Sequence, residues 1–226
     1  MEHVFLLIPS PLLGPATWRP VEAWLRAQGH PAQAVNFGAQ PRTPAGVLDA
    51  VVAAANSQRV VLVPHSNAGL YAPHLASLVD VEATVFVDAA LPGPEAEQQA
   101  ETPLAPPAFM DFLRGLANQQ GVLPPWTEWW GDVGDLFPHS SVREAVEHEQ
   151  QQLQLGYFAS RMPVPSGWTQ RSAAYLAFGE TYADERERAV RLGWATRTMA
   201  GRHLHALHDP AGVGASILDL SRQPSS

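Results

Sequence analysis

Short apolar runs rich in valine alternate along this chain with amphipathic stretches, and this alternation limits the possible folds more than any other feature of the sequence. A continuous apolar run of a few residues suits a strand that is buried on both faces. The intervening stretches repeat their apolar residues at helical spacing, so they can cover the faces of a sheet. We therefore predict an α/β fold with one mostly parallel sheet of about six strands and flanking helices.

Turn and capping residues place these elements along the chain. Gly29 follows the first amphipathic stretch and Pro44 begins the second, and these are favoured positions for a glycine after a helix and a proline at its start. We predict strands over residues 4–9, 32–37, 60–63, 83–87, 173–178 and 195–199. We predict helices over residues 18–28, 44–55, 70–78, 183–192 and 210–220.

The composition changes between the fourth and the fifth predicted strand. Residues 93–171 contain nine prolines and four of the seven tryptophans, with short helical patterns and no clear strand signal. A chain of 226 residues is expected to form one domain with a sizeable core. We therefore predict a single domain over residues 1–226, with its core formed by 1–92 and 172–226 and a cap, or lid, inserted over 93–171.

Charge and missing residue types exclude several classes of function. The formal net charge of −8 argues against nucleic-acid binding, which needs a basic surface. The chain has no cysteine and no lysine, which excludes a thiol nucleophile, a disulfide framework and Schiff-base chemistry. The first apolar run, 4–8, lacks a basic leader and is far shorter than the about 20 residues that span a membrane. We expect a cytoplasmic protein that binds no cofactor, nucleic acid or membrane, and the sequence allows a homodimer.

The segment 60–70 joins the strongest predicted strand directly to a helix, with Ser66 at the junction. In such a strand–turn–helix the serine hydroxyl stands above the sheet, and the helix N-terminus stabilises negative charge. The pattern indicates a nucleophile, although a serine that only caps a helix fits the same letters. The outer positions that are usually glycine in a nucleophile elbow are Pro64 and Ala68 in this chain.

Four segments, in this order along the chain, resemble segments of the α/β-hydrolase superfamily. They are 4–18 (first central strand and following loop), 60–70 (nucleophile elbow), 84–92 (strand after the elbow helix) and 201–210 (terminal Gly-x-His loop). The resemblance covers residues 1–92 and 172–226 and leaves the predicted cap outside. It implies an α/β-hydrolase fold without the usual leading hairpin, and a serine nucleophile served by a histidine and a carboxylate.

The resemblance places the catalytic base at His203, in the Gly-x-His loop, and leaves two positions for the acid. Most of the superfamily has the acid after the strand that follows the cap, at a Gly-x-x-Asp spacing that lands here on Tyr182, between Glu180 and Asp184. A minority branch has it one strand earlier, where this chain has Asp88. We predict Asp88 as the acid, with Glu180 as the alternative.

The oxyanion hole is expected to use the backbone N–H of Asn67, the residue after the nucleophile. The resemblance places the second donor in the loop after the first strand, at Pro11, which has no N–H. The N–H of Leu12 or the hydroxyl of Ser10 can replace it, and otherwise the hole is incomplete. We predict Leu12 as the second donor and Pro11 as a residue that contacts the substrate.

Indole side chains concentrate in the predicted cap, and insertions at this place in the superfamily form the lid of the pocket. We expect Trp126, Trp129 and Trp130, with Trp168 further along, to form an apolar wall, although packing of the cap's own core explains the same residues. The sequence therefore predicts a serine hydrolase that cleaves a small, largely apolar ester, thioester or related acyl substrate through an acyl-enzyme.

Other classes of function stay open beside this one. A catalytically weak or inactive protein of the same fold would bind an apolar small molecule, and Pro11 and Pro64 keep this alternative open, as does a lyase-type reaction on the same scaffold. The segment 203–209 superficially resembles the ligand cluster of metallo-β-lactamases, but its residues stand in the wrong order and a further downstream histidine is absent. We therefore predict no metal site.

Overall fold

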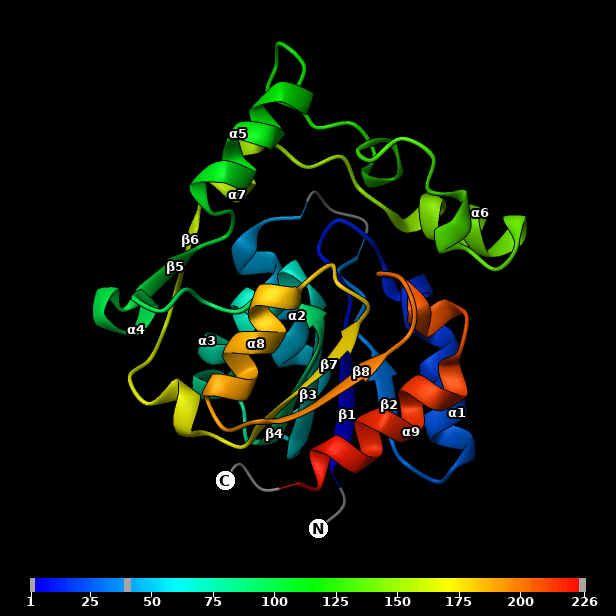
Figure 1. Cartoon of the computed structure of the whole chain (residues 1–226), viewed down its shortest axis with the longest axis vertical. Coiled ribbons are helices and arrows are strands. Elements are labelled where there is room, and N and C mark those ends of the chain that lie inside the picture. The colour runs from blue at the N-terminus through cyan, green and yellow to red at the C-terminus, as the bar shows by residue number, and fades with distance from the viewer. Residues whose placement is uncertain (1–2, 39–41, 224–226) are drawn as a thin grey trace.

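A computed structural model describes residues 3–38 and 42–223. Within these residues six strands form one sheet in the order β2-β1-β3-β4-β7-β8, and each pairing in that sheet is parallel. Because the six strands run the same way, their carboxyl ends lie along one edge of the sheet, where α/β folds bind their ligands (Figure 1). The fold class predicted from the sequence is confirmed.

Strands and helices alternate along the core of the chain. The strands are β1 (Val4–Ile8), β2 (Ala32–Ala34), β3 (Val60–Ser66), β4 (Val81–Ala89), β5 (Glu101–Pro103), β6 (Arg161–Pro163), β7 (Ala173–Phe178) and β8 (Ala195–Met199). The α-helices are α1 (Arg19–Ala27), α2 (Pro44–Ala55), α3 (Ala72–Leu78), α4 (Ala96–Gln99), α5 (Pro107–Leu116), α6 (Ser140–Glu149), α7 (Leu155–Phe158), α8 (Ala183–Arg191) and α9 (Pro210–Ser221). Within the described ranges, none of these helices combines the length and the apolar character needed to cross a membrane.

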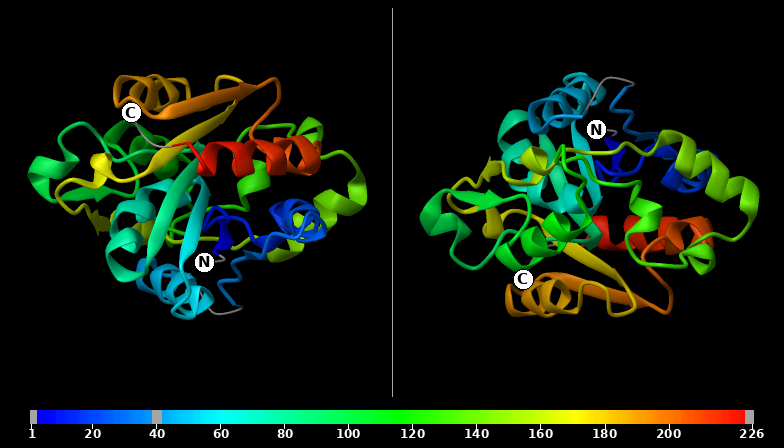
Figure 2. Two further views of the ribbon diagram at one scale, coloured as in Figure 1. Left: turned by 90° about the horizontal axis from the view of Figure 1, so that it is seen from below. Right: turned by 90° about the horizontal axis from the view of Figure 1, so that it is seen from above.

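Side chains alternate along each strand and so divide the core into two sides. Phe5 and Leu7 of β1 pack on the side that α1 and α9 cover. Leu6 and Ile8 pack on the opposite side, with residues of α2 and α3. Figure 2 shows α1 and α9 together on one side of the sheet. Because both faces are covered, the seven residues of β3 are all buried, which explains its continuous apolar run.

Residues 93–171, here named the inserted segment, connect β4 to β7. The part with α5, α6 and α7 lies above the carboxyl edge of the sheet, and α4, β5 and β6 lie along its flank (Figure 1). The segment contains α4 to α7 and an antiparallel pairing of β5 with β6 near its two ends. No clear strand was predicted in this region, and that prediction was wrong for β5 and β6. Each of them is three residues long and ends in proline, so neither can show an alternating apolar pattern.

Among the predicted elements that are shorter in the structure, two have clear local reasons. The predicted helix 70–78 is α-helical only from Ala72, and the preceding turn over Asn67–Tyr71 is a 3-10 helix. Pro73, in the first turn of α3, has no N–H and so cannot extend the α-helical hydrogen bonds toward the preceding turn.

The predicted strand 32–37 pairs only over Ala32–Ala34, at the edge of the sheet. Shortly beyond, the side chain of Asn36 accepts a hydrogen bond from Gly38 N at 2.9 Å. A local bond of this kind forms a turn in place of an extended strand, so the pairing ends.

Candidate active site

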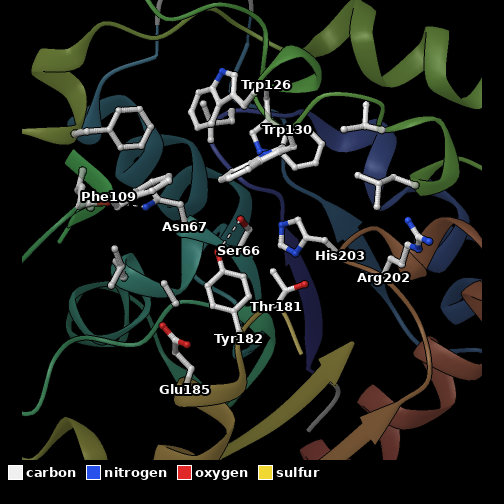
Figure 3. Close-up of a pocket in the computed structure, with 18 of the residues that line it drawn as sticks. Ser66, Asn67, Phe109, Trp126, Trp130, Thr181, Tyr182, Glu185, Arg202 and His203 are labelled. Atoms are coloured by element: carbon white, nitrogen blue, oxygen red, sulfur yellow. Dashed lines mark hydrogen bonds between the residues drawn. The ribbon is translucent and has the colours of Figure 1, made fainter. Parts of the chain in front are cut away.

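Ser66 ends β3 near the middle of the sheet, and its backbone has a positive φ of 58°. A residue with a side chain adopts this conformation rarely, and it persists where surrounding structure holds a tight turn. That turn packs closely on the end of β4, because a Cβ added to Gly69 would lie 2.1 Å from the carbonyl oxygen of Ala90. The Ser66 hydroxyl is thereby presented at the carboxyl edge of the sheet (Figure 3).

Asp88, near the end of β4, is fully buried and contacts His203. Its Oδ2 lies 2.6 Å from Nδ1 of His203, and its Oδ1 accepts a hydrogen bond from Phe178 N at 3.0 Å. A buried carboxylate needs such donors, because burial of an unpaired charge is costly. Since Nδ1 faces Asp88, Nε2 is the nitrogen of His203 that is left to exchange a proton, and the imidazole lies beside Ser66 in Figure 3.

His65, the residue before Ser66, contacts both the ring and the backbone of His203. The two imidazole rings stack with centroids 4.4 Å apart, and Nε2 of His65 lies 2.9 Å from the carbonyl oxygen of His203, to which it donates. Burial, together with the neighbouring His203, lowers the pKa of His65 well below its ordinary value, so this ring stays neutral at neutral pH. No motif in the sequence assigned His65 a role, and in the structure it supports the loop that carries His203.

The alternative acid, Glu180, lies away from His203. Its side chain is 76% exposed and pairs with the guanidinium of Arg186 at 3.2 Å. Asp184, in the first turn of α8, is also exposed. Of the three carboxylates that the sequence offered, Asp88 is the one that contacts the imidazole.

Tyr182 lies where the Gly-x-x-Asp spacing pointed, directly before α8. Its hydroxyl is 3.3 Å from Ser66 Oγ, and its ring centroid is 5.6 Å from that of His203. Burial raises the pKa of the Tyr182 phenol, so the phenol keeps its proton at neutral pH. The spacing was the one signal in the sequence that could have identified this residue, because 116 positions separate it from Ser66.

A cavity of about 540 Å³ lies above Ser66 and is lined by residues of the core and of the inserted segment (Figure 3). The three tryptophans predicted to form an apolar wall, Trp126, Trp129 and Trp130, all line it. Phe109 and Phe158, which the sequence analysis did not single out, add to the same wall. A cavity of this size and lining suits a small, largely apolar ligand.

Two residues predicted for this wall or for substrate contact lie outside the lining of the cavity. Trp168 packs against Trp194 with ring centroids 5.7 Å apart and belongs to a separate part of the core. Pro11 is buried, and its carbonyl oxygen accepts a hydrogen bond from the guanidinium of Arg42 at 2.6 Å. Pro11 therefore serves to hold its loop in place.

The two predicted oxyanion donors, Asn67 and Leu12, both line the cavity. The amide side chain of Asn67 donates to the carbonyl oxygen of Leu104 in the inserted segment at 2.8 Å. The N–H of Leu12 lies 3.4 Å from Ser10 Oγ, which is a long hydrogen bond within the loop. The loop after β1 thus brings Leu12 to the cavity, with its N–H turned toward a neighbouring hydroxyl.

Arg42 joins the loop after β1 to the inserted segment. Its guanidinium donates hydrogen bonds to the carbonyl oxygens of Pro11, Leu13 and Glu149. Burial lowers the pKa of Arg42 to about 10, which still leaves the side chain charged at neutral pH. We name this arrangement the Arg42 clamp.

One cluster of metal-ligand residue types occurs in the described part of the chain, namely His65, Asp88 and His203, whose ligand atoms lie within 4.8 Å of one another. Nδ1 of His203 and Oδ2 of Asp88 are bonded to each other, and Nε2 of His65 is bonded to a carbonyl oxygen. These atoms already make the hydrogen bonds that orient His203. The arrangement therefore fits an oriented imidazole better than a metal centre.

No family model matches the sequence, and no curated protein sequence matches it. Solved structures do match. Polyneuridine aldehyde esterase superimposes with a TM-score of 0.74 at 16% identity, over 98% of this chain and 100% of that one. An extracellular α/β-hydrolase from a Paenibacillus species gives 0.73 at 16% identity, with the same coverage. The chain has the α/β-hydrolase fold.

A pyrethroid hydrolase from Sphingobium faniae also matches, with a TM-score of 0.65 at 16% identity over 99% of both chains. Tomato methylketone synthase I gives 0.68 at 14% identity over 98% of both chains. In this chain Ser66 stands at the end of β3, Asp88 near the end of β4 and His203 after β8, so three strands bring the candidate site residues to one edge of the sheet.

Proposed function

We propose that this protein is a serine hydrolase that cleaves a small, largely apolar ester, thioester or related acyl compound. The observation that carries the proposal is the pairing of His203 with the buried Asp88, beside a serine held in a strained turn. Strained backbone and a buried histidine–carboxylate pair at one edge of the sheet are features of a nucleophilic site. The same fold occurs in an esterase and in a pyrethroid hydrolase, which supports the assignment.

In the proposed reaction Ser66 Oγ attacks the acyl carbon while Nε2 of His203 accepts the serine proton. Asp88 keeps the other proton on Nδ1 and stabilises the imidazolium that forms. His203 then returns its proton to the leaving oxygen or sulfur, and water repeats the sequence to release the acid. To enter the reaction the Ser66 hydroxyl turns from Tyr182 toward His203, as catalytic hydrogen bonds often align only when substrate binds.

The backbone N–H groups of Asn67 and Leu12 are the proposed oxyanion donors, since both residues line the cavity at Ser66. Leu12 can exchange its long bond to Ser10 Oγ for a shorter bond to a developing negative charge. The aromatic wall of Trp126, Trp129 and Trp130 excludes water and favours an apolar acyl or alcohol group. The inserted segment acts in this proposal as the lid of the site.

Labelling with a fluorophosphonate probe tests the proposal. The wild-type protein should be labelled at Ser66, and Ser66→Ala should abolish labelling and lower the hydrolysis of p-nitrophenyl butyrate by about 10³-fold or more. Ser77→Ala is the matched control, because Ser77 is an exposed serine on α3, and it should be labelled like the wild type.

A binding protein without catalysis is the second candidate. It is favoured by one observation, that the Ser66 hydroxyl is engaged by Tyr182 in this structure. A wild-type protein that resists the probe, yet shows quenched tryptophan fluorescence when an apolar ligand is added, would replace the hydrolase proposal by this one.

A further inference from the structure

The phenol of Tyr182 is the polar side chain that touches the proposed nucleophile. Its Oη is 3.3 Å from Ser66 Oγ. Within the residues that the structure describes, neither of these two hydroxyls makes another hydrogen bond. Figure 3 shows the two groups facing each other across the floor of the cavity. A role for this contact rests on the hydrolase function proposed above and deepens it.

The sheet order determines the side from which Tyr182 reaches Ser66. The loop after β1, which carries Leu12, and the loop after β7, which carries Tyr182, lie on opposite sides of β3 in the order β2-β1-β3-β4-β7-β8. His203 follows β8, and its ring centroid is 5.6 Å from that of Tyr182. Tyr182 therefore lies beside the proton-transfer group His203, and it comes from a loop across β3 from the loop of the proposed oxyanion donor Leu12.

In acyl transfer the carbonyl oxygen turns toward the oxyanion donors, and the leaving oxygen turns toward the histidine that protonates it. A group on the histidine side, 3.3 Å from Ser66 Oγ, therefore lies near the leaving oxygen when the acyl carbon is bonded to Oγ. The Tyr182 hydroxyl has a proton to donate there, because a phenol keeps its proton at neutral pH, and burial raises the pKa of this one further.

We propose that Tyr182 is a catalytic residue that hydrogen-bonds the leaving-group oxygen during acylation and the attacking water during deacylation. In acylation the bond from Ser66 Oγ to the acyl carbon forms, and the serine proton goes to Nε2 of His203. The bond to the leaving oxygen then breaks, its electron pair stays on that oxygen, and the oxygen takes the proton from His203. Tyr182 lends a hydrogen bond to this oxygen and keeps its own proton throughout.

The test compares two esters of one acyl group, ethyl butyrate and p-nitrophenyl butyrate, with Tyr182→Phe. Ethoxide is a poor leaving group that needs help, and p-nitrophenolate is a good one that does not. For acylation, which kcat/KM reports, Tyr182→Phe should lose about 10- to 100-fold on ethyl butyrate and less than about 3-fold on p-nitrophenyl butyrate. A merely structural role would lower both values alike.

Tyr157→Phe is the matched control, because it removes a buried phenol that bonds Tyr71 and does not line the cavity. It should leave the ratio of kcat/KM for the two esters at the wild-type value. Equal losses on both esters in Tyr182→Phe, or an activity at or above wild type, overturn the role of Tyr182 while the hydrolase proposal stands. A wild-type protein that is neither labelled by the fluorophosphonate nor active on either ester overturns the hydrolase proposal itself.

Discussion

The end of β4 and the loop after β7 lie at the same edge of the sheet, and each carries a carboxylate that the sequence made a candidate acid. At the end of β4, Asp88 is fully buried and its two oxygens bond His203 and Phe178 N. After β7, Glu180 is 76% exposed and pairs with Arg186. The residue of the β7 loop that faces the site is Tyr182, which carries no charge.

This difference teaches that hydrogen-bond donors, rather than proximity to the sheet edge, decide which carboxylate is buried beside His203. A buried carboxylate is tolerated where hydrogen-bond donors meet both of its oxygens, and the end of β4 supplies them. Glu180, in the loop after β7, pairs instead with Arg186 at the surface, so its carboxylate stays in solvent.

The largest expected effect comes from removing the charge at the end of β4. Asp88→Asn keeps the size of the side chain, but its amide would donate to Nδ1 of His203 and force the proton onto Nε2, which then cannot accept the serine proton. We expect kcat for p-nitrophenyl butyrate to fall by about 10³- to 10⁴-fold.

Glu180→Gln is the paired control and should stay within about 2-fold of wild type, because its surface ion pair contributes little. Far-UV circular dichroism of both variants checks that the fold is kept. A loss of less than 10-fold in Asp88→Asn, together with a large loss in Glu180→Gln, would reverse the comparison and place the acid in the β7 loop.

A smaller effect, on stability, separates two tyrosines, of which one bonds the end of β4 and the other belongs to the loop after β7. The hydroxyl of Tyr175, on β7, accepts from Ala89 N at 3.0 Å and donates to Ala89 O at 2.7 Å, so it holds the end of β4. Tyr175→Phe leaves two buried backbone groups without this partner, and we expect the free energy of unfolding to fall by about 2 kcal/mol. Tyr182→Phe leaves only the Ser66 hydroxyl, which can turn to His203, and should cost less than about 1 kcal/mol. Urea denaturation measures both, and equal losses would show that the β7 loop is as tightly built as the end of β4.

The smallest expected effect concerns Glu185, in the first turn of α8 beyond the β7 loop. Partial burial raises the pKa of this carboxyl above its ordinary value of 4.5, although a bond to its own backbone N–H opposes the shift. A raised pKa means that the unfolded chain loses its proton first, so stability falls as the pH rises through the folded-state pKa. Glu185→Gln should therefore gain about 0.5 kcal/mol at pH 7, a figure that allows for screening of a group still partly in solvent.

The gain from Glu185→Gln should disappear as the pH falls below 4.5, the ordinary pKa of the carboxyl, because the group then becomes protonated in both the folded and the unfolded state. Thermal denaturation of the two proteins from about pH 7 down to about one unit below that ordinary pKa follows the change. A gain that is independent of pH would show that the charge of Glu185 is fully solvated, like that of Glu180.

The sequence predicts the core of the fold because each central strand and its covering helices leave a local pattern. The bounds of α2, β7 and β8 agree with the predicted ranges, and Ser66 stands at the predicted junction of β3 with a helical turn. Strands β5 and β6 could not be predicted, because their pairing joins three-residue pieces about 60 positions apart, and neither piece is apolar throughout.

The candidate site likewise combines residues that could be proposed from the sequence with contacts that could not. The order of Ser66, Asp88 and His203 along the chain follows from the resemblance, so those residues could be proposed from the sequence. The contacts of Tyr182 with Ser66 and of Arg42 with the loop after β1 join residues that no motif links. Pro11 was expected to face substrate because of its place in the chain, yet its orientation depends on a guanidinium 31 residues away.

The Arg42 clamp has a consequence for how the site can vary. All three carbonyl oxygens that the Arg42 guanidinium binds belong to the backbone. These hydrogen bonds therefore depend on the course of the backbone and do not depend on which side chains the bonded residues carry. Side chains of the loop after β1 and of the inserted segment can therefore change to suit a new ligand while the Arg42 clamp stays in place. One exchange at position 42 would instead free the loop after β1 from the inserted segment, and both of these contribute residues to the lining of the cavity.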